Sequence, residues 1–430
     1  MGRTRQVWSQ VRYRHLLAAE SPAALARLGT EAFDEALARR TLSVKLPMWR
    51  DYARQNLRWA VERAGGRGDL LPRHLRPFTR LARRFSDVPT VVIGFGPSFH
   101  RHRELLCTLR RDRCRLVATD RALPLLWEAG CLPDVVVNLD SGDQTRAFAV
   151  GTPRPYLEAL VQQGWIVRSR SAYRALRSQA DWSALRADRG AWWRVHPLLP
   201  TDECGKIFAA VASVGPLSLD QVAEAVGLSP RPVPGGAWVT LLAMTSNPGA
   251  STWFRGPKYW YLPYLERRLS RALERLTGQP CLLTAGNVGT TAMNLSVILG
   301  ARPVYLVGMD FGYDLAVGFG KDQRETTTQG MVGDPNLAAY AVATRALLVH
   351  PDLRLLYEAS EVTNLSGGIL HGPFIARGDA RDLPDLLRRR RLLPAPAMEH
   401  AEGQARDRLA AFGRAVRGGS ASAPRRAASR

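Results

Sequence analysis

Long apolar runs, lysines and paired cysteines are all scarce in this sequence of 430 residues. Nowhere do about 18 uncharged apolar residues follow one another, as a membrane-spanning helix requires. The N-terminus is basic but has no continuous apolar core, so it does not resemble a signal peptide. These absences predict a soluble protein that is not exported.

The five cysteines are an odd number, and no two of them form a C-x-x-C pair that would suggest a zinc or dithiol redox site. A disulfide framework is therefore not expected in so long a chain, and free thiols fit a reducing compartment. The sequence predicts a cytoplasmic protein. The five are Cys107, Cys114, Cys131, Cys204 and Cys281.

Acidic residues are few, with 38 against 60 basic ones, which gives a formal net charge of +22. Four of the basic residues are lysines, so arginine supplies nearly all of the excess. Such charge suits nucleic acid, a membrane surface or a phosphorylated ligand, and it also follows from the codon usage of a GC-rich genome. The charge alone does not choose among these explanations.

Among the functions that a strongly basic protein could have, the sequence disfavours DNA binding. Residues 217–230 (LSLDQVAEAVGLSP) resemble the middle of a helix-turn-helix, but three prolines follow in SPRPVPGG, where the recognition helix would run. Each proline inside a helix costs about 3 kcal/mol. The helix that would read the bases is therefore missing.

The hydrophobic pattern divides the chain into three parts. Over 1–87, apolar residues recur at three- and four-residue spacing, which predicts a helical N-terminal region. Residues 88–393 hold short β-branched runs between helical segments, with a less regular stretch, rich in Trp, Pro and Arg, at about 150–280. Residues 394–430 contain few large apolar side chains, so we expect a frayed helix followed by a disordered basic tail.

The β-branched runs indicate the fold class. They are apolar on both faces, and segments that can hold a helix connect them, as is typical of a parallel sheet covered on two sides. The sequence thus predicts an α/β protein whose sheet is built from 88–150 and 280–375. The runs are PTVVIG (89–94), RLVAT (115–119), DVVVNLD (134–140) and PVYLVGMD (303–310).

The first candidate site is the glycine loop Gly94-Phe95-Gly96-Pro97-Ser98, directly after a predicted strand. Glycines let a ligand approach the backbone, and the N–H groups of the following helix attract an anion. The loop has no third glycine at the spacing of a dinucleotide-binding fingerprint. A tight turn without a ligand is the alternative, and the position at the carboxyl end of a strand favours binding.

The second candidate site joins the ends of the next two predicted strands, at Ala118-Thr119-Asp120 and at Asn138-Leu139-Asp140-Ser141-Gly142-Asp143. Carboxylates at this edge accept ribose hydroxyls, bind a metal or deprotonate a nucleophile. We assign such a role to Asp120 and Asp140. Asp134, after Pro133, is instead interpreted as a turn residue.

The third candidate site comes late in the chain, at Thr284-Ala285-Gly286-Asn287 and Thr290, before a predicted helix. Small hydroxyl and amide residues at a helix N-terminus suit a phosphate. The next predicted strand ends in Gly308-Met309-Asp310, which adds an acid at the same edge. Three strand ends that lie far apart in the sequence fit one composite site. His371, in a later loop, is a candidate general base, although a structural role is the commoner one for such a histidine.

In order along the chain, VVIGFGPSF, ATDRALPLLWEAGCLPDVVVNLD and TAGNVGTTAMNLSVILGARPVYLVGMDFGYD resemble one known domain. Archaeal 6-hydroxymethylpterin diphosphokinases (MptE-like proteins) share it with the motility-associated factor (Maf) glycosyltransferases that modify flagellin. The resemblance covers about 85–145 and 280–375, and its last part is also similar to bacterial sialyltransferases that use CMP-sialic acid.

The resemblance implies a Rossmann-like domain that holds a phosphate-bearing substrate. It implies that Gly94, Gly96, Pro97 and Ser98 match the glycine loop of the family. The other two motifs of the family match the remaining strand ends, at Thr119, Asp120, Asp140, Gly286, Asn287, Gly308 and Asp310.

For function, the resemblance implies a bacterial transferase with a nucleotide-activated donor. The interpretation we prefer is a Maf-like enzyme that moves a nonulosonate-type sugar from a CMP-sugar to a hydroxyl of a protein or glycan acceptor, with Asp140 and His371 as catalytic groups. The alternative is ATP-dependent pyrophosphoryl transfer to a pterin, in which Asp140 and Asp143 would hold Mg²⁺. The third interpretation is a member of the family that binds a nucleotide but catalyses no reaction. No other cofactor is expected.

Overall fold

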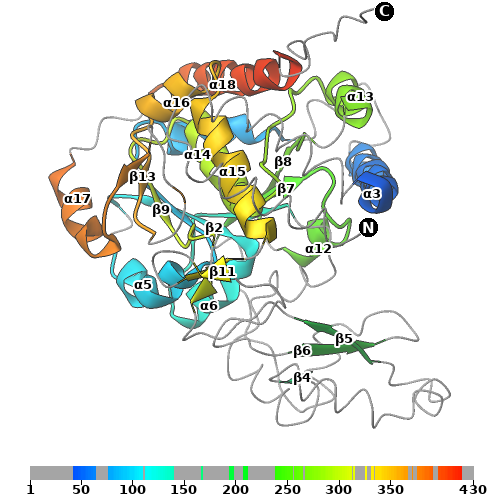
Figure 1. The fold of residues 1–430 in the computed structure, drawn as a ribbon. Coiled ribbons are helices and arrows are strands. Elements are labelled where there is room, and N and C mark those ends of the chain that lie inside the picture. The colour runs from blue at the N-terminus through cyan, green and yellow to red at the C-terminus, as the bar shows by residue number, and fades with distance from the viewer. Residues whose placement is uncertain are drawn as a thin grey trace, which may run out of the picture.

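The computed structural model contains a Rossmann-like α/β domain with one large parallel sheet (Figure 1). It describes residues 42–63, 76–109, 112–139, 166–167, 193–197, 207–211, 238–254, 256–264, 267–311, 313–314, 325–326, 331–333, 335–366, 370, 375–390 and 396–418.

Eight parallel strands form the central sheet, in the spatial order β14-β13-β9-β1-β2-β3-β7-β8. The predicted runs appear in it as β1, β2, β3 and β9, which confirms the expected fold class. The strands are β1 (Thr90–Ile93), β2 (Arg115–Thr119), β3 (Val135–Asn138), β7 (Val239–Ala243), β8 (Lys258–Tyr261), β9 (Val304–Val307), β13 (Thr363–Asn364) and β14 (Ala376–Arg377).

The order of the strands reverses between β1 and β9. From β1 the chain moves outward through β2, β3, β7 and β8, and then returns to the other side of β1 as β9 before it continues to β13 and β14. In open α/β sheets, ligands bind outside the carboxyl ends of the strands at such a switch point. The turns after β1 and β9 are therefore the first place to look for a site.

Alternate residues of each strand face opposite sides of the sheet, as the two-residue period of a strand requires. Val92, Val117 and Leu306 pack in one core, whereas Val91 and Leu116 pack in another, and all five are buried. Figure 1 shows α14 and α15 lying across the first face. The elements of this face are η2 (Phe78–Arg84), α14 (Val288–Ile298), α15 (Pro335–Val349), α16 (Arg354–Ala359) and α18 (Met398–Gly418).

The opposite face is covered in two parts. One set of helices packs under β1, β2 and β9, and these are α5 (Pro97–Cys107), α6 (Leu123–Glu128), η4 (Ala380–Asp382) and α17 (Leu383–Arg389), with η3 (Asp120–Ala122) before α6. The other set packs under β3, β7 and β8, and these are α3 (Leu42–Arg63), α12 (Ala250–Trp253) and α13 (Arg267–Thr277).

Two small sheets accompany the large one. They have the orders β10-β12-β11 and β4-β6-β5. Their strands are β4 (Ile166–Val167), β5 (Trp193–Pro197), β6 (Ile207–Val211), β10 (Tyr313–Asp314), β11 (Glu325–Thr326) and β12 (Met331–Gly333).

The stretch from 150 to 280 is less irregular than its composition predicts. It supplies β7 and β8 to the central sheet, so the expectation that this sheet uses 88–150 and 280–375 alone is wrong. The run WVTLLAM at 238–244 is apolar and β-branched like the others, and its residues are buried. Because the residues around this run are rich in Trp and Pro, the composition of the whole stretch does not indicate the strand.

The frayed helix expected at the start of 394–430 is instead the regular helix α18 at 398–418, which packs on the core. Ala401, Ala405, Leu409 and Phe412 are buried in the core that covers the first face. Small alanine side chains let the helix approach its neighbours closely, so α18 buries a continuous stripe with few large apolar residues. Residues 419–430 lie outside the described part of the chain.

The predicted helical N-terminal region is observed where the structure describes it, in α3 and η2. Asn56 of α3 is buried and donates hydrogen bonds to the carbonyls of Met244 (2.9 Å) and Ser246 (3.0 Å), which attach α3 next to β7. Residues 1–41 and the rejected helix-turn-helix at 217–230 lie outside the described residues. Among the residues described, no helix combines the length and apolarity that a membrane crossing needs.

Candidate functional site

The glycine loop Gly94–Ser98 joins β1 to α5 and packs directly on the turn that follows β9. The N–H of Gly96 donates to the carbonyl oxygen of Gly308 (2.8 Å). A Cβ atom on Gly94 or Gly96 would collide with that same carbonyl. The two glycines are therefore required for the contact between the turns, whereas the sequence predicted that they make room for a ligand.

Asp310 occupies the N-terminus of α5. Its Oδ2 accepts hydrogen bonds from the Ser98 backbone N–H (3.0 Å) and from Ser98 Oγ (2.7 Å). Ser98 Oγ in turn accepts from the N–H of Gly308 (2.7 Å). Pro97 has no N–H, and the N–H of Phe99 donates to the Gly96 carbonyl (3.0 Å). The anion expected at this helix N-terminus is thus the carboxylate of Asp310 itself.

Asp310 is fully buried, with 0% of its surface exposed. Burial raises the pKa of its carboxyl group, and the two bonds from Ser98 oppose that rise. Its second oxygen, Oδ1, is buried and has no hydrogen-bond partner among the described residues. A buried oxygen without a partner costs free energy, on the order of 1–3 kcal/mol, unless a ligand or a water supplies the donor.

A second set of polar groups lies at the ends of β2 and β3. Asp120 accepts from the N–H of Arg121 (2.8 Å) with Oδ1 and from Asn138 Nδ2 (2.6 Å) with Oδ2. Because an ionised carboxylate only accepts, this contact fixes which way the Asn138 amide points. The carbonyl oxygen of that amide, Oδ1, is buried without a partner in the described structure, and so is Oγ1 of Thr119.

Tyr261, the last residue of β8, supports this set from the side. Its hydroxyl donates to the backbone carbonyl of Asn138 (2.9 Å). Complete burial raises the pKa of Tyr261 well above its ordinary value, and the charge of Asp120 adds to the rise. The sequence placed Asn138 within the second candidate site but gave it no role of its own, and it gave no indication of Tyr261. Asn138 ends an apolar run at the predicted edge, and that position was the available signal.

The loop before α14 has mostly structural roles. Asn287 is the N-cap of α14, and its Oδ1 accepts from the N–H of Thr290 (2.7 Å). Thr290 Oγ1 lies 2.6 Å from Thr344 Oγ1 of α15, so this hydroxyl joins two helices. Gly286 has φ +74°, and a Cβ there would press against the ring of Tyr340. Of these residues, Gly286 is the exposed one.

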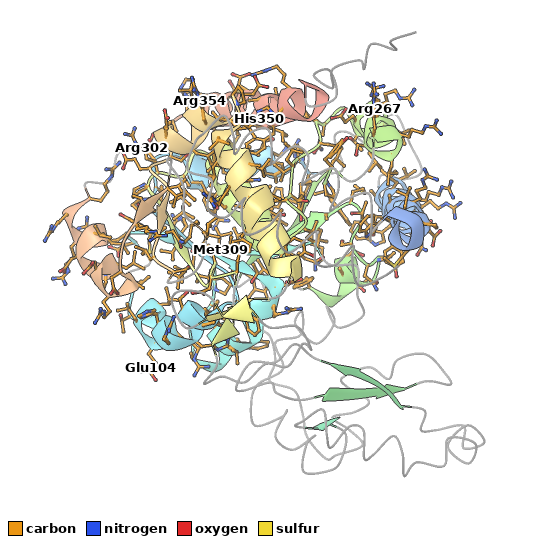
Figure 2. The ribbon with its side chains drawn as sticks, in the orientation of Figure 1. Glu104, Arg267, Arg302, Met309, His350 and Arg354 are labelled. Atoms are coloured by element: carbon orange, nitrogen blue, oxygen red, sulfur yellow. The ribbon has the colours of Figure 1, made fainter. Side chains whose placement is uncertain are left out.

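Met309, which is labelled in Figure 2, joins the first and the third candidate sites at one edge of the sheet. Its side chain lies where a Cβ on Gly289, at the start of α14, would collide with the sulfur atom. The same sulfur lies 3.2 Å from the place of a Cβ on Gly94. The glycine loop, the turn after β9 and the N-terminus of α14 therefore meet around Met309, as a composite site requires.

Three predicted residues lie outside the described part of the chain, namely Asp140, Asp143 and His371. Within the described part, no group of three or more His, Cys, Asp or Glu side chains is arranged to hold a metal ion. Asp134 lies at the opposite edge, where its Oδ2 accepts from the N–H of Leu116 (2.8 Å), in agreement with its assignment as a structural residue.

Comparison with known families matches residues 70–154 to the family described as 6-hydroxymethylpterin diphosphokinase MptE-like. Residues 70–154 are thus similar to this family, and we call them the MptE-like segment. The MptE-like segment contains β1, β2 and β3, and with them Gly94, Ser98, Thr119, Asp120 and Asn138. Asp310 and the α14 N-terminus reach the same edge from outside the segment.

Among solved structures, the chain is similar to a Maf glycosyltransferase from Magnetospirillum magneticum AMB-1, with 16% sequence identity and a TM-score of 0.38. The match covers 78% of this chain and 42% of that one, so this chain spans less than half the length of that protein. No curated protein matches the sequence.

Proposed function

We propose that the protein is a transferase that binds a nucleotide-activated donor at the carboxyl ends of β1, β2, β3 and β9. Its MptE-like segment supports this assignment, and so does the reversal of strand order between β1 and β9, where α/β sheets bind ligands. For the donor we propose a CMP-sugar of the nonulosonate type, and for the acceptor a hydroxyl of a protein or glycan. This choice follows the sequence resemblance and the helical region before the sheet.

One observation carries the proposal most strongly. Buried polar atoms without a partner occur at several places in the described structure, and three of them lie at this edge, namely Thr119 Oγ1, Asn138 Oδ1 and Asp310 Oδ1. Native proteins satisfy nearly all buried polar atoms, so several exceptions along one sheet edge indicate groups whose partners come from a ligand or from water. Ribose and sugar hydroxyls are donors of the right kind.

The position of the donor phosphate follows from the charge at the two helix N-termini. Asp310 already occupies the N-terminus of α5, and a second anion there would be repelled. The N-terminus of α14 meets the same edge at Met309 and Gly289, and its helix dipole favours an anion. We therefore place the phosphate at the start of α14, near the exposed Gly286, and the ribose or sugar toward Asp310.

In the transfer step, the acceptor oxygen forms a bond to the anomeric carbon of the sugar, and the bond from that carbon to the phosphate oxygen breaks, so that CMP leaves. The proton of the acceptor hydroxyl passes to a general base. We assign this base to Asp140 or His371, both outside the described residues.

The description of the matched family favours a second candidate, ATP-dependent pyrophosphoryl transfer to a pterin. In that reaction Mg²⁺ neutralises the transferred phosphates, and Asp140 with Asp143 would hold it.

Thermal-shift titration with CMP, CMP-sugars and ATP, each with and without Mg²⁺, separates these candidates. A ligand at one hundred times its Kd stabilises the folded state by about 2.7 kcal/mol, so specific binding gives a clear shift. Stabilisation by cytidine nucleotides without Mg²⁺ is the expected result. Stabilisation by ATP with Mg²⁺ instead would support the kinase. Cytidine binding without any turnover would favour a non-catalytic member, and no shift with any of these ligands would contradict both enzymes.

A further inference from the structure

The helix α13 carries a row of exposed arginines on its outer side. Its inner side packs on the core under β3, β7 and β8 through the buried Leu273. Arg267, Arg271 and Arg275 are exposed and follow one another at four-residue spacing, so they lie along one face of the helix over about 12 Å. Figure 2 shows Arg267 at the outer side of α13. The three guanidinium groups therefore face the solvent together.

The positive charges of this arginine row are not neutralised within the described part of the chain. None of its three arginines forms an ion pair with a described residue. Arg275 Nε donates to the backbone carbonyl of Arg271 (3.3 Å), and this contact leaves the charge of Arg275 unbalanced. On α18, by contrast, Arg406 pairs with Glu402 one turn earlier (2.6 Å). The arginine row is thus open to an anionic partner from outside.

The position of the arginine row lowers the stability of α13 instead of raising it. Like charges four residues apart on a helix repel each other, and the row contains two such pairs. Arg267 is also the first residue of α13, whose first turn contains no acid, and a cation at that end opposes the helix dipole. A negatively charged surface would relieve both repulsions. The row therefore fits an external anionic partner better than a role in the fold.

An exposed leucine beside the arginine row indicates which anionic partner it fits. Leu276 is 56% exposed and follows Arg275 directly, about 100° around the helix from it. The backbone of a nucleic acid offers no apolar surroundings to such a side chain. At a membrane surface, leucine enters the boundary between headgroups and acyl chains while arginines lie among anionic headgroups. A cationic face with an apolar flank thus favours an anionic lipid surface over nucleic acid.

We propose that the outer face of α13 binds the surface of an anionic membrane, with the arginine row among phospholipid headgroups and Leu276 in the apolar boundary. The contact is peripheral, because Leu273 on the inner side of the helix stays in the protein core. Each arginine near such a surface strengthens binding about fivefold, so the row contributes on the order of a hundredfold. The site is independent of the proposed donor site, since α13 contains none of the residues assigned to it.

Co-sedimentation of the full chain with vesicles tests the proposal. The parent should bind vesicles of phosphatidylcholine with about 30% phosphatidylserine, and it should bind vesicles of phosphatidylcholine alone at least about tenfold more weakly. The double variant Arg271→Gln/Arg275→Gln should weaken binding to the anionic vesicles at least about tenfold. Both positions are exposed and glutamine is a good helix former, so α13 should stay folded, which circular dichroism checks.

The double variant Arg377→Gln/Arg389→Gln is the matched control. It removes the same charge from two exposed arginines, one in β14 and one in α17. β14 lies at the opposite end of the central sheet from β8, and Figure 1 shows α17 and α13 on opposite sides of the molecule. Vesicle binding of this control should stay within about threefold of the parent. Equal losses in the two double variants, or equal binding of the parent to both kinds of vesicle, would overturn the proposal.

Leu276→Ser separates a membrane from nucleic acid as the partner. The substitution removes no charge, so it should weaken binding to anionic vesicles about threefold or more and leave binding to a DNA duplex unchanged. Leu276→Ser that binds the vesicles like the parent, or an effect of Arg271→Gln/Arg275→Gln confined to DNA, would contradict the proposal. These measurements contain no CMP or CMP-sugar, so their result holds or fails separately from the proposed transferase.

Discussion

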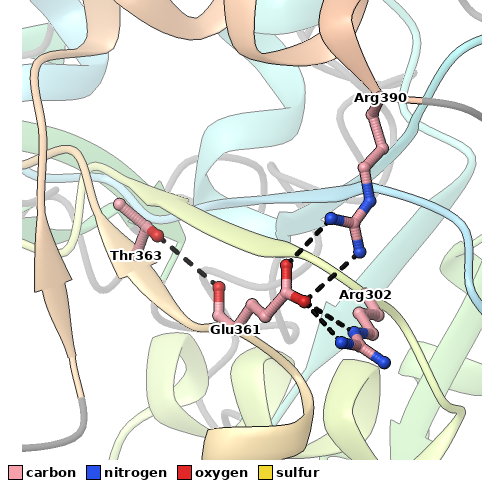
Figure 3. A network of polar contacts seen from close by, with 4 residues as sticks. All are labelled: Arg302, Glu361, Thr363 and Arg390. Atoms are coloured by element: carbon pink, nitrogen blue, oxygen red, sulfur yellow. Dashed lines mark hydrogen bonds and ion pairs between the residues drawn. The ribbon is translucent and has the colours of Figure 1, made fainter.

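The acidic side chains Glu361 and Asp134 at the amino edge of the central sheet differ from Asp310 at its carboxyl edge in how they are satisfied. At the amino edge, Glu361 is paired with Arg302 (2.6 Å) and Arg390 (3.2 Å), as Figure 3 shows. Asp134 likewise accepts from the backbone of Leu116 and lies 4.0 Å from the guanidinium of Arg115. At the carboxyl edge, Asp310 keeps one buried oxygen without a described partner.

This difference separates polar groups that hold the fold from polar groups available to a ligand. The arginine pairs of the amino edge are partly exposed, so they satisfy their own charges in contact with water and need no other partner. At the carboxyl edge, the open positions of Thr119, Asn138 and Asp310 are buried, where a missing hydrogen bond is most costly. The predictions below test this contrast, from the largest expected effect to the smallest.

Gly308→Ala should give the largest change in stability. Gly308 has φ +76°, and a Cβ there would lie 2.5 Å from the carbonyl oxygen of Gly94. The left-handed backbone costs about 1–2 kcal/mol for alanine, and the collision with backbone adds about 1–3 kcal/mol. We expect a loss of about 2–5 kcal/mol in the free energy of unfolding, measured in urea.

Gly130→Ala is its control. Gly130 has a similar φ of +73°, but nothing lies within 4 Å of an added Cβ. This variant should lose only the backbone part, about 1–2 kcal/mol. Equal losses in the two variants would show that the close contact between the turns after β1 and β9 is not needed.

Asp310→Asn should weaken binding of the cytidine nucleotide or CMP-sugar while the protein stays folded. The substitution keeps the shape of the side chain and one acceptor for Ser98, but it places an NH₂ group where a ligand hydroxyl would donate. Loss of a hydrogen bond to a charged group costs about 1.5–3 kcal/mol, which is roughly ten- to more than a hundredfold in affinity. Calorimetric titration measures this loss.

Asp134→Asn makes the corresponding change at the amino edge, where the amide oxygen can still accept from Leu116. Its nucleotide affinity should stay within about twofold of the parent. A similar loss of affinity in both variants would mean that nucleotide binding depends on the net charge of the protein and not on the edge of the sheet at which a charge is removed.

Glu361→Gln should have the smallest effect, below about 1 kcal/mol at neutral pH, because surface ion pairs contribute little. Burial by itself would raise the pKa of Glu361, but Arg302 and Arg390 outweigh it and hold this pKa below its ordinary value of 4.5. The ion pairs therefore contribute fully above about pH 4.5 and are lost as the pH falls through the folded-state pKa.

Urea unfolding of the parent and of Glu361→Gln between pH 3 and pH 7 should thus show a small difference that disappears in acid. A difference that grows as the pH falls would contradict the pairing. Nucleotide binding at pH 7 should be unchanged in this variant.

The central strands could be predicted because their residues are apolar on both faces, and the two short strands at one end of the sheet could not. β1, β2, β3 and β9 lie within continuous apolar runs, whereas β13 and β14 are two residues long and leave no comparable run. α18 was predicted only as a frayed helix, because alanines rather than large apolar residues bury most of its inner face. Patterns that count large side chains overlook such close packing.

For the site, the sequence located the strand ends but not the roles of the residues there. Gly96, Asp310 and Asn287 lie at the expected edge, yet each makes contacts within the protein that only the three-dimensional arrangement reveals. The role of Asn138 became visible only in the structure, where its amide donates a hydrogen bond to Asp120 of the neighbouring strand end. The spacing of the two residues along the chain does not predict this contact. Gly96→Val, which the ligand-approach interpretation would use to test nucleotide binding, would instead disrupt the contact with Gly308 and Asp310.

Hydrogen exchange measured by mass spectrometry, with and without saturating CMP or CMP-sugar, tests the central claim most directly. The account predicts slower exchange at the carboxyl edge, in peptides that contain 94–99, 118–121, 137–139 and 308–311. It also predicts unchanged exchange at the amino edge, in peptides that contain 112–116 and 361–364. Protection confined to the amino edge, or spread equally over both edges, would contradict the assignment of the donor site.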